Sequence, residues 1–280
     1  MKKILVLGGG EFLGYWIAKV LELNSYEITF FNTGKNTPKL FSNFYTKVGD
    51  RRDYKNKTFF SGSSFDVIID TSAYSPLDLA LTKYLEHSQY IFISSVAVYS
   101  KSIPLYSNEN AKKIIDKVKF TEDRSYTYGE LKFLTEVELQ MISKNCTILR
   151  PAIILGDRDN TGRLSMYTKQ SKDYISLPNL TNMPFQYIDV IDVANFVRTV
   201  LENKLFGAFN VTNKSISRDE FFLILASIQK KRLTYNDFFD PRLYPLHESI
   251  ENSSLRTLSS DLALKNGLEF TPVEQTLSKY

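Results

Sequence analysis

Short apolar runs alternate with amphipathic stretches through the first half of the chain. The run Lys3–Leu7 is almost continuously apolar, which is typical of a parallel strand covered on both faces. The strands predicted in this half are Lys3–Leu7, Glu27–Phe31, Phe44–Val48, Phe65–Ile69, Tyr90–Ser94 and Cys146–Leu149. Helical patterns between such strands indicate an α/β fold with a doubly wound parallel sheet.

The predicted helices have a clear apolar side. Two i, i+4 rows mark the first of them, namely Phe12, Trp16 and Val20 beside Leu13, Ile17 and Leu21. Further helices are predicted near Leu77–Leu85, Tyr128–Ile142 and Val190–Leu201. Each is long enough to cover one face of a sheet.

After residue 150 the pattern loosens, with polar loops at 156–163 and 177–184. Strands are predicted at Phe185–Ile188 and Ala208–Val211. Capping boxes predict two later helices, and they are formed by Ser217 with Glu220 and by Thr271 and Pro272 with Glu274. Asp189 and Asp192 are interpreted as helix caps. We expect a sheet domain over 1–154, completed by about 186–214, and a smaller C-terminal substrate-binding lobe mainly over 155–280.

Composition limits the possible classes of protein. The chain has 280 residues, 43% hydrophobic and 24% charged, which is ordinary for a globular protein. Its net charge of +4 is too small to indicate nucleic-acid binding. Cys146 is the one cysteine, and two histidines form no metal motif. The apolar run at the N-terminus is too short for a signal peptide or a membrane span, so we expect a cytoplasmic protein without metal or membrane.

The segment Leu7–Gly14 is a glycine-rich turn between a buried strand and a helix. Glycine permits a tight turn and lets the backbone approach a pyrophosphate, whose charge free N–H groups at the helix start stabilise. A missing side chain at Gly14 lets helix and strand pack closely. Strand, turn, helix and second strand occur in order, which predicts a dinucleotide-binding Rossmann domain. Its candidate contacts are Gly8, Gly10, Glu11, Phe12, Leu13 and Gly14.

The end of the second strand bears on cofactor choice. Folds that prefer NAD commonly carry an acidic residue there, which binds the ribose hydroxyls. Here the residue is Asn32, and Lys35 follows three positions later. No carboxylate would repel a 2′-phosphate and one cation could attract it, so the sequence favours NADP over NAD.

Three polar residues at or after predicted strand ends form a candidate catalytic set. Tyr128 and Lys132 are four apart on a predicted helix and therefore share a face. A nearby ammonium can lower the pKa of a phenol toward neutrality, so that Tyr128 exchanges a proton with a carbinol or carbonyl oxygen. Ser95 could hold the same oxygen while a nicotinamide exchanges hydride with the carbon.

Together these motifs resemble the extended short-chain dehydrogenase/reductase superfamily, in its NAD-dependent epimerase/dehydratase branch. The matching stretches are Gly8–Gly14, Gly49–Asp53, Asp70–Ala73, Phe92–Ser95 with Tyr99, Tyr128–Lys132, Arg150–Pro151, Phe185–Val193 and Phe209–Thr212. The resemblance implies that Asp50 and Arg51 lie near the adenine. It also implies that Thr71, Ser72, Ala73 and Pro151 line the dinucleotide path.

The same resemblance assigns Ser95, Tyr128 and Lys132 as the catalytic triad, with Tyr128 and Lys132 also contacting the cofactor. Ser95 is preferred to Ser94 because of its spacing from Tyr99. Two positions depart from the superfamily's pattern. Glu11 replaces the middle glycine of the turn, and its carboxylate would repel pyrophosphate unless it points outward. Asn32 is the second departure.

The residues after Ser95 narrow the chemistry. Similar dehydratases carry acidic residues there, but here Val96, Ala97 and Val98 follow, and none transfers a proton. Cys146 is predicted to be buried rather than catalytic. A carbonyl reductase, an alcohol dehydrogenase and an epimerase acting by hydride transfer remain, with a small-molecule substrate that is a sugar nucleotide by resemblance. A non-catalytic NAD(P)-binding regulator or scaffold is the alternative, and a nucleic-acid-binding relative is a third possibility, supported only by the modest positive charge. We expect a monomer or a homodimer and no nucleic-acid partner.

Overall fold

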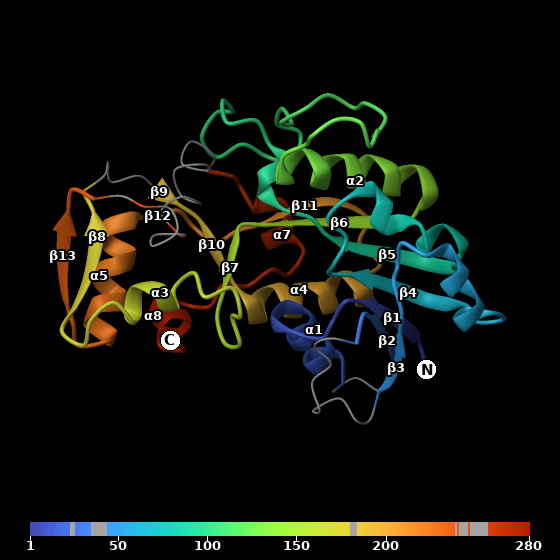
Figure 1. Cartoon of the computed structure of the whole chain (residues 1–280), viewed down its shortest axis with the longest axis horizontal. Helices are drawn as coiled ribbons and strands as arrows, with labels where there is room; N and C mark the ends of the chain where they lie inside the picture. Colours follow the sequence, from blue (N-terminus) through green and yellow to red (C-terminus); the bar gives the residue numbers. More distant parts are fainter. Residues whose placement is uncertain (23–25, 35–43, 180–183, 239, 241–245, 247–256) are drawn as a thin grey trace.

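The computed structural model describes residues 1–22, 26–34, 44–179, 184–238, 240, 246 and 257–280. Its centre is a sheet of seven parallel strands in the order β11-β6-β5-β4-β1-β2-β3 (Figure 1). The strands are β1 (Lys3–Leu7), β2 (Glu27–Asn32), β3 (Tyr45–Val48), β4 (Phe65–Asp70), β5 (His87–Ile93), β6 (Cys146–Pro151) and β11 (Gly207–Val211). The predicted doubly wound parallel sheet is confirmed.

Helices cover both faces of this sheet. In Figure 1, α1 (Phe12–Glu22) and α4 (Val190–Asn203) lie on one side and α2 (Tyr128–Ile142) lies on the other. Side chains of β1 alternate between the two layers. Ile4 and Val6 belong to the apolar cluster with α1 and α4, whereas Leu5 and Leu7 belong to the cluster on the α2 side. Burial on both faces explains why the strand is apolar at nearly every position.

The α-helix predicted near Leu77–Leu85 is wrong. The chain forms two 3₁₀ turns instead, η3 (Pro76–Leu79) and η4 (Thr82–Tyr84). The guanidinium Nε of Arg51 donates to the carbonyl of Asp78, and the amide of Leu81 donates to the carbonyl of Arg51. These backbone groups bind a distant arginine instead of each other, so the i, i−4 ladder of an α-helix is not made.

Smaller elements form a second apolar core at one end of the molecule, on the left in Figure 1. They are β7 (Ile153–Leu155), α3 (Ser165–Thr168), β8 (Tyr174–Pro178), β9 (Pro184–Phe185), β10 (Tyr187–Asp189), β12 (Ile216–Ser217), α5 (Arg218–Ile228), β13 (Arg232–Asn236) and α8 (Val273–Leu277). Another short helix, α7 (Asp261–Lys265), contacts β11. The predicted strand Phe185–Ile188 is wrong as one element, because β9 pairs with β12 and β10 pairs with β7. Between them, the side chain of Gln186 binds the backbone of Asn213 and Leu258.

The predicted caps have mixed outcomes. Ser217 accepts a hydrogen bond from the amide of Glu220, and Asp189 caps α4 by accepting from the amide of Ile191, as predicted. Thr271 does not cap a helix, since α8 begins at Val273 and the Thr271 hydroxyl donates to Asp192, 2.6 Å away. A search of the described residues finds no helix long and apolar enough to cross a membrane.

Candidate dinucleotide and catalytic site

The glycine turn joins β1 to α1 with backbone angles that favour glycine. Gly8 has φ +96° and Gly9 has φ +82°, in a region that side chains rarely tolerate. A Cβ added to Gly14 would lie 2.3 Å from the Cα of Gly9, so the first turn of α1 rests directly on the turn. Gly14 therefore lets α1 approach the glycine turn, whereas the sequence predicted a close approach between the helix and strand β1.

The end of β4 forms the other wall of this cradle. A Cβ at Gly8 would lie 2.5 Å from the Thr71 hydroxyl and 3.0 Å from the Ser72 Cβ, so glycine leaves the space between the two strand ends open. The Thr71 hydroxyl donates to the carbonyl of Leu7 at 3.1 Å, which holds the two strand ends together. With the N–H groups at the start of α1 beside it, the cradle fits the pyrophosphate of a dinucleotide.

Glu11 points away from the cradle. The residue is exposed, and its carboxylate accepts a hydrogen bond from the side-chain amide of Asn160. Asn160 belongs to the 156–163 loop. In this loop the carbonyl of Asp157 also accepts a hydrogen bond from the indole of Trp16, at 3.0 Å. The outward orientation that the sequence required of Glu11 is therefore present. The polar residue in the turn ties α1 to the 156–163 loop.

The described residues at the end of β2 reach only to Gly34 and include no cation. The side-chain oxygen of Asn32 accepts from the amide of Gly34 at 2.8 Å, and Lys35 lies outside the described residues. Farther along, Asp50 is exposed and its carboxylate accepts from the amide of Arg52. Arg51 is turned inward, where it contacts Asp70, the hydroxyl of Ser72 and the carbonyl of Asp78.

Asp70 is a buried centre of hydrogen bonds at the end of β4. It is 0% exposed, and both of its carboxylate oxygens accept from the Arg51 guanidinium, at 2.5 and 2.7 Å. It also accepts from the Tyr90 hydroxyl and from the amides of Ser72 and Ala73. Arg51 and these donors hold the pKa of Asp70 below its usual value in spite of burial. The loop 71–73 that lines the cradle is thereby fixed to the sheet.

Replacing Asp70→Asn should destabilise the fold by about 3–5 kcal/mol, because it leaves the buried Arg51 without its counter-charge. Urea unfolding measures the change. Asp66→Asn is the matched control, since Asp66 lies on the same strand but is exposed and only accepts from the amide of Lys3. A loss for Asp70→Asn no larger than that for Asp66→Asn would contradict the structural role given to this pair.

The two serines after β5 face different surroundings. The hydroxyl of Ser94 is buried and donates to Glu136 at 2.5 Å. Ser95 is partly exposed, caps the 3₁₀ turn η5 (Val96–Val98) and lies close enough to the phenol of Tyr128 to lower its pKa. Of the two, Ser95 is therefore the serine beside Tyr128. Cys146 is buried at the start of β6, as predicted.

The electrostatics of Tyr128 differ from the sequence-based expectation. The residue keeps 49% of its surface exposed, yet the protein around the phenol raises the pKa of Tyr128 to about 12. Ser95 and the guanidinium of Arg163 lower this pKa, but desolvation outweighs them. The phenol is therefore protonated at neutral pH, and Lys132 is not among the groups that shift its pKa.

Lys132 is buried at 3% exposure one helical turn from Tyr128. Its ammonium donates to the carbonyls of Ala73 and Ile93, at 2.7 and 2.8 Å. Burial lowers the pKa of Lys132 to about 8. The lysine thus joins the carboxyl ends of β4 and β5, which bound the site on two sides. Pro151 ends β6 and is buried.

Three further residues shape this site and were missed from sequence. A Cβ at Gly129 would lie 2.2 Å from the carbonyl oxygen of Ala97, so this glycine lets the start of α2 pack closely against the 3₁₀ turn η5. The ring of Tyr74 lies 6.4 Å from that of Tyr128 and 5.0 Å from the ammonium of Lys132. Arg163 acts on Tyr128 from the second lobe. Of the three, only Tyr74 had a position in the sequence that pointed to the site, because it directly follows the predicted 71–73 loop.

No family model matches the chain. A curated relative, the chloroplast stem-loop binding protein of 41 kDa b from Arabidopsis thaliana, is 32% identical over 175 residues, which are 55% of this chain and 43% of the relative. The chain thus matches less than half the length of that relative.

Solved structures resemble the chain over nearly its whole length. The UDP-glucose 4-epimerase of Thermotoga maritima with UDP-glucose has a TM-score of 0.77 at 18% identity, covering 99% of this chain and 96% of the other. The UDP-glucuronic acid 4-epimerase of Bacillus cereus with NAD has a TM-score of 0.75 at 17% identity, covering 99% and 94%. The dTDP-glucose 4,6-dehydratase of Bacillus anthracis with NAD has a TM-score of 0.73 at 14% identity, covering 100% and 95%.

These structures include epimerases and a dehydratase, so the fold is common to both reactions and does not choose between them. The Rossmann-type fold that the resemblance implied is thus confirmed.

Proposed function

We propose that this protein is an NAD(P)-dependent epimerase or reductase that transfers hydride at a carbinol or carbonyl carbon of a small molecule. The observation that carries the proposal is the group of Ser95, Tyr128 and Lys132 at the carboxyl edge of the sheet. There the phenol is partly exposed, and Ser95 is near enough to lower its pKa. The glycine cradle lies at the same edge, where open α/β sheets bind their ligands.

The residues of this chain have distinct parts in such a reaction. A bound nicotinamide would supply or accept the hydride. The protonated phenol of Tyr128 can donate its proton to the oxygen of a carbonyl that is being reduced, so that hydride and proton together give the alcohol. The Ser95 hydroxyl can hold the same oxygen. Lys132 is a positioning residue here, because its ammonium fixes the strand ends around the phenol.

The oxidation direction requires Tyr128 to accept a proton. With a pKa of about 12, the phenolate is scarce at neutral pH. Reduction is therefore the direction that this arrangement supports best. An epimerase, which oxidises and then reduces one carbon, would need the phenol pKa to fall when substrate and cofactor bind.

A sugar nucleotide is the proposed substrate class, since the names of the similar structures include UDP-glucose and UDP-glucuronic acid 4-epimerases. The lobe over 155–280 would select it. Val96, Ala97 and Val98 provide no acid beside Ser95, which favours hydride transfer without elimination. Incubating the protein with NADH or NADPH and a panel of UDP- and dTDP-sugars, and following cofactor absorbance and sugar products, tests the activity. The proposal would be overturned if the protein bound dinucleotides no better than a control protein.

The proposed cofactor preference changes in the light of the structure. The sequence favoured NADP because of Asn32 and Lys35, but Lys35 lies outside the described residues, and the structures from both Bacillus species contain NAD. Arg51 is largely buried in its pair with Asp70, whereas Arg52 binds Asp78 through Nε alone and stays exposed. We expect NADH to bind at least as tightly as NADPH, as the two dissociation constants from isothermal titration will show. A Kd for NADPH tenfold below that for NADH would restore the original interpretation.

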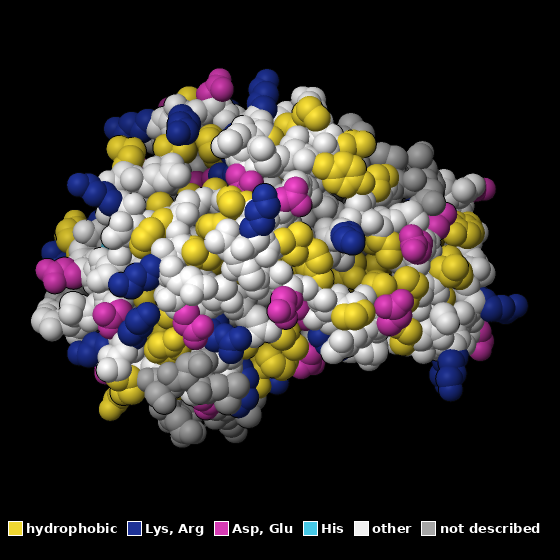
Figure 2. Space-filling model, turned by 180° about the vertical axis from the view of Figure 1, so that it is seen from behind, with side chains coloured by type: hydrophobic (Ala, Val, Ile, Leu, Met, Phe, Trp, Pro, Cys, Tyr) yellow, Lys and Arg dark blue, Asp and Glu magenta, His cyan; other side chains and the backbone are white. Residues whose placement is uncertain are grey.

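A second candidate rests on the name of the Arabidopsis relative, which describes stem-loop binding. Binding of an RNA stem-loop would fit the non-catalytic alternative. The surface gives it little support, because Figure 2 shows basic and acidic side chains interspersed over the face in view rather than a basic stripe. Retention of the protein on an immobilised RNA stem-loop, falling steeply with added salt, would favour this candidate.

A further inference from the structure

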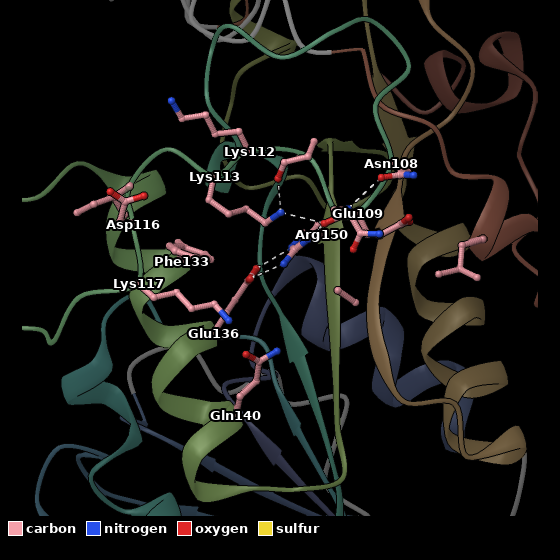
Figure 3. A pocket seen from close by; sticks show the side chains of 15 residues that line it. Asn108, Glu109, Lys112, Lys113, Asp116, Lys117, Phe133, Glu136, Gln140 and Arg150 are labelled. Carbon is pink, nitrogen blue, oxygen red and sulfur yellow. Dashed lines mark hydrogen bonds and ion pairs between the residues drawn. The ribbon is translucent and has the colours of Figure 1, made fainter.

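A cavity of about 640 Å³ lies beside α2, and no residue of the glycine turn lines it. It is bounded by the 108–117 loop, the Phe133, Glu136 and Gln140 side of α2, and residues of β6, β11 and α7 (Figure 3). Its size falls in the range that holds a metabolite-sized ligand. Tyr128 and Lys132 do not line it.

The floor of the cavity is a buried ion pair. Arg150 binds both carboxylate oxygens of Glu136, at 2.7 and 3.0 Å, and the two side chains are 6% and 2% exposed. Arg150 also donates to the Tyr99 hydroxyl and to the carbonyl of Glu109. Since Glu136 is neutralised by Arg150 and also accepts from Ser94, it offers little net charge to other cations in the cavity.

The cations around this floor are only partly balanced. Figure 3 shows Lys113 and Lys117 pointing inward, toward the Arg150–Glu136 pair, whereas Lys112 and Asp116 point outward. The inward side chains carry three positive charges, on Lys113, Lys117 and Arg150, and two negative charges, on Glu109 and Glu136. One oxygen of Glu109 is already bound to the amide of Asn210. Among the described residues, none lies within ion-pair distance of Lys117.

Lys113 is built into the wall rather than free on the surface. Its ammonium donates to the carbonyls of Glu109 and Ala111 and lies 4.4 Å from the centre of the Tyr99 ring. Burial and the nearby Arg150 lower the pKa of Lys113 to about 8. An anion beside this ammonium would stabilise its charged form against both burial and repulsion from Arg150. Gln140, whose amide points into the cavity in Figure 3, adds a neutral donor.

We propose that this cavity is a second ligand site, separate from the cradle, that binds a small molecule bearing a phosphate or diphosphate group through Lys113 and Lys117. Phosphate suits the site because lysines bind it as point charges and need no planar, two-pronged geometry. The occupant would not contact Tyr128 or Lys132, because neither residue lines the cavity. It would touch the Glu136–Ser94 contact, one residue from Ser95.

Lysine footprinting with inorganic pyrophosphate as the probe tests this site. The full-length protein is treated briefly with an acetylating reagent with and without pyrophosphate, and acetylation is quantified at each lysine by mass spectrometry. We expect pyrophosphate to slow acetylation of Lys113 and Lys117 several-fold and to leave Lys119 unchanged. Because the readout is residue by residue, pyrophosphate bound at the glycine cradle does not confuse it. Equal protection of all lysines, or none at Lys113 and Lys117, would overturn the proposal.

A variant provides the second measurement. Lys117→Gln removes an exposed ammonium and should fold normally; about tenfold more pyrophosphate should then be needed to protect Lys113 from acetylation, the usual effect of losing one charge-assisted contact. Lys119→Gln is the matched control, because Lys119 is also exposed on the same loop but does not line the cavity. Equal weakening by both variants would show a general charge effect and no site.

Discussion

Replacing Tyr128→Phe should lower turnover by a factor of about 10²–10⁴ while NADH binding stays within about twofold, as expected for the loss of a general acid. The phenol hydroxyl is the group on this side chain that can protonate the substrate oxygen. Val96, Ala97 and Val98, which follow Ser95, provide no acid that could replace it. Phenylalanine fills the same space, so the change removes chemistry without disturbing α2. Steady-state kinetics on any substrate that the panel identifies, with NADH titration in parallel, measures both parts.

Tyr126→Phe is the matched control for this experiment. Tyr126 lies two residues earlier, and its hydroxyl contacts only Thr121 at the edge of hydrogen-bond distance. Turnover by the Tyr126→Phe protein should stay close to that of the wild type. Full activity in Tyr128→Phe would exclude the proposed role of the phenol, and the dinucleotide could then be bound for a purpose other than hydride transfer.

The second large effect is expected from Gly129→Ala. Alanine would place a Cβ 2.2 Å from the backbone oxygen of Ala97, a distance that forces α2 away from the 3₁₀ turn η5. Overpacking of this kind destabilises by about 1–3 kcal/mol and sometimes more. Since Tyr128 is the neighbouring residue, the same shift should separate the phenol from Ser95 and reduce turnover. Urea unfolding and steady-state kinetics measure the two effects.

The sign of the stability change makes this test decisive. On helix propensity alone, alanine in place of glycine would stabilise α2 by up to about 1 kcal/mol. A more stable Gly129→Ala protein would therefore contradict the close contact with Ala97. Met141→Ala, at an exposed position near the other end of the same helix, controls for general effects of substitution in α2 and should change stability by no more than about 0.5 kcal/mol.

Local periodicity in the sequence was enough for the frame of the fold. The bounds of β1 match the prediction, and the other six strands of the sheet deviate by no more than a few residues at each end. Such strands are buried on both faces, so the apolar pattern is strong and short-range. The glycine turn was also readable, because its backbone angles and its contact with α1 leave room for little besides glycine.

Side-chain partners far apart in the chain escaped this kind of prediction. Glu11 meets Asn160 across 149 positions, and no local pattern shows whether its carboxylate faces the cradle or leaves it. Arg51 reaches Asp70 and the carbonyl of Asp78, which fixes the 71–73 loop and breaks the predicted helix into 3₁₀ turns. These outcomes depend on which buried charges meet in the folded chain.

The sequence by itself thus determined the parallel sheet, the place of the cradle, and the residue types able to exchange a proton. The sequence preferred Ser95 to Ser94 by resemblance alone; the tertiary structure supplies the physical reason, since the hydroxyl of Ser94 is taken by Glu136. Only the tertiary structure decided that Lys132 binds the strand ends of β4 and β5 and that the phenol pKa is raised rather than lowered. Strand periodicity is local, whereas desolvation and pairing of charges depend on everything packed around a group.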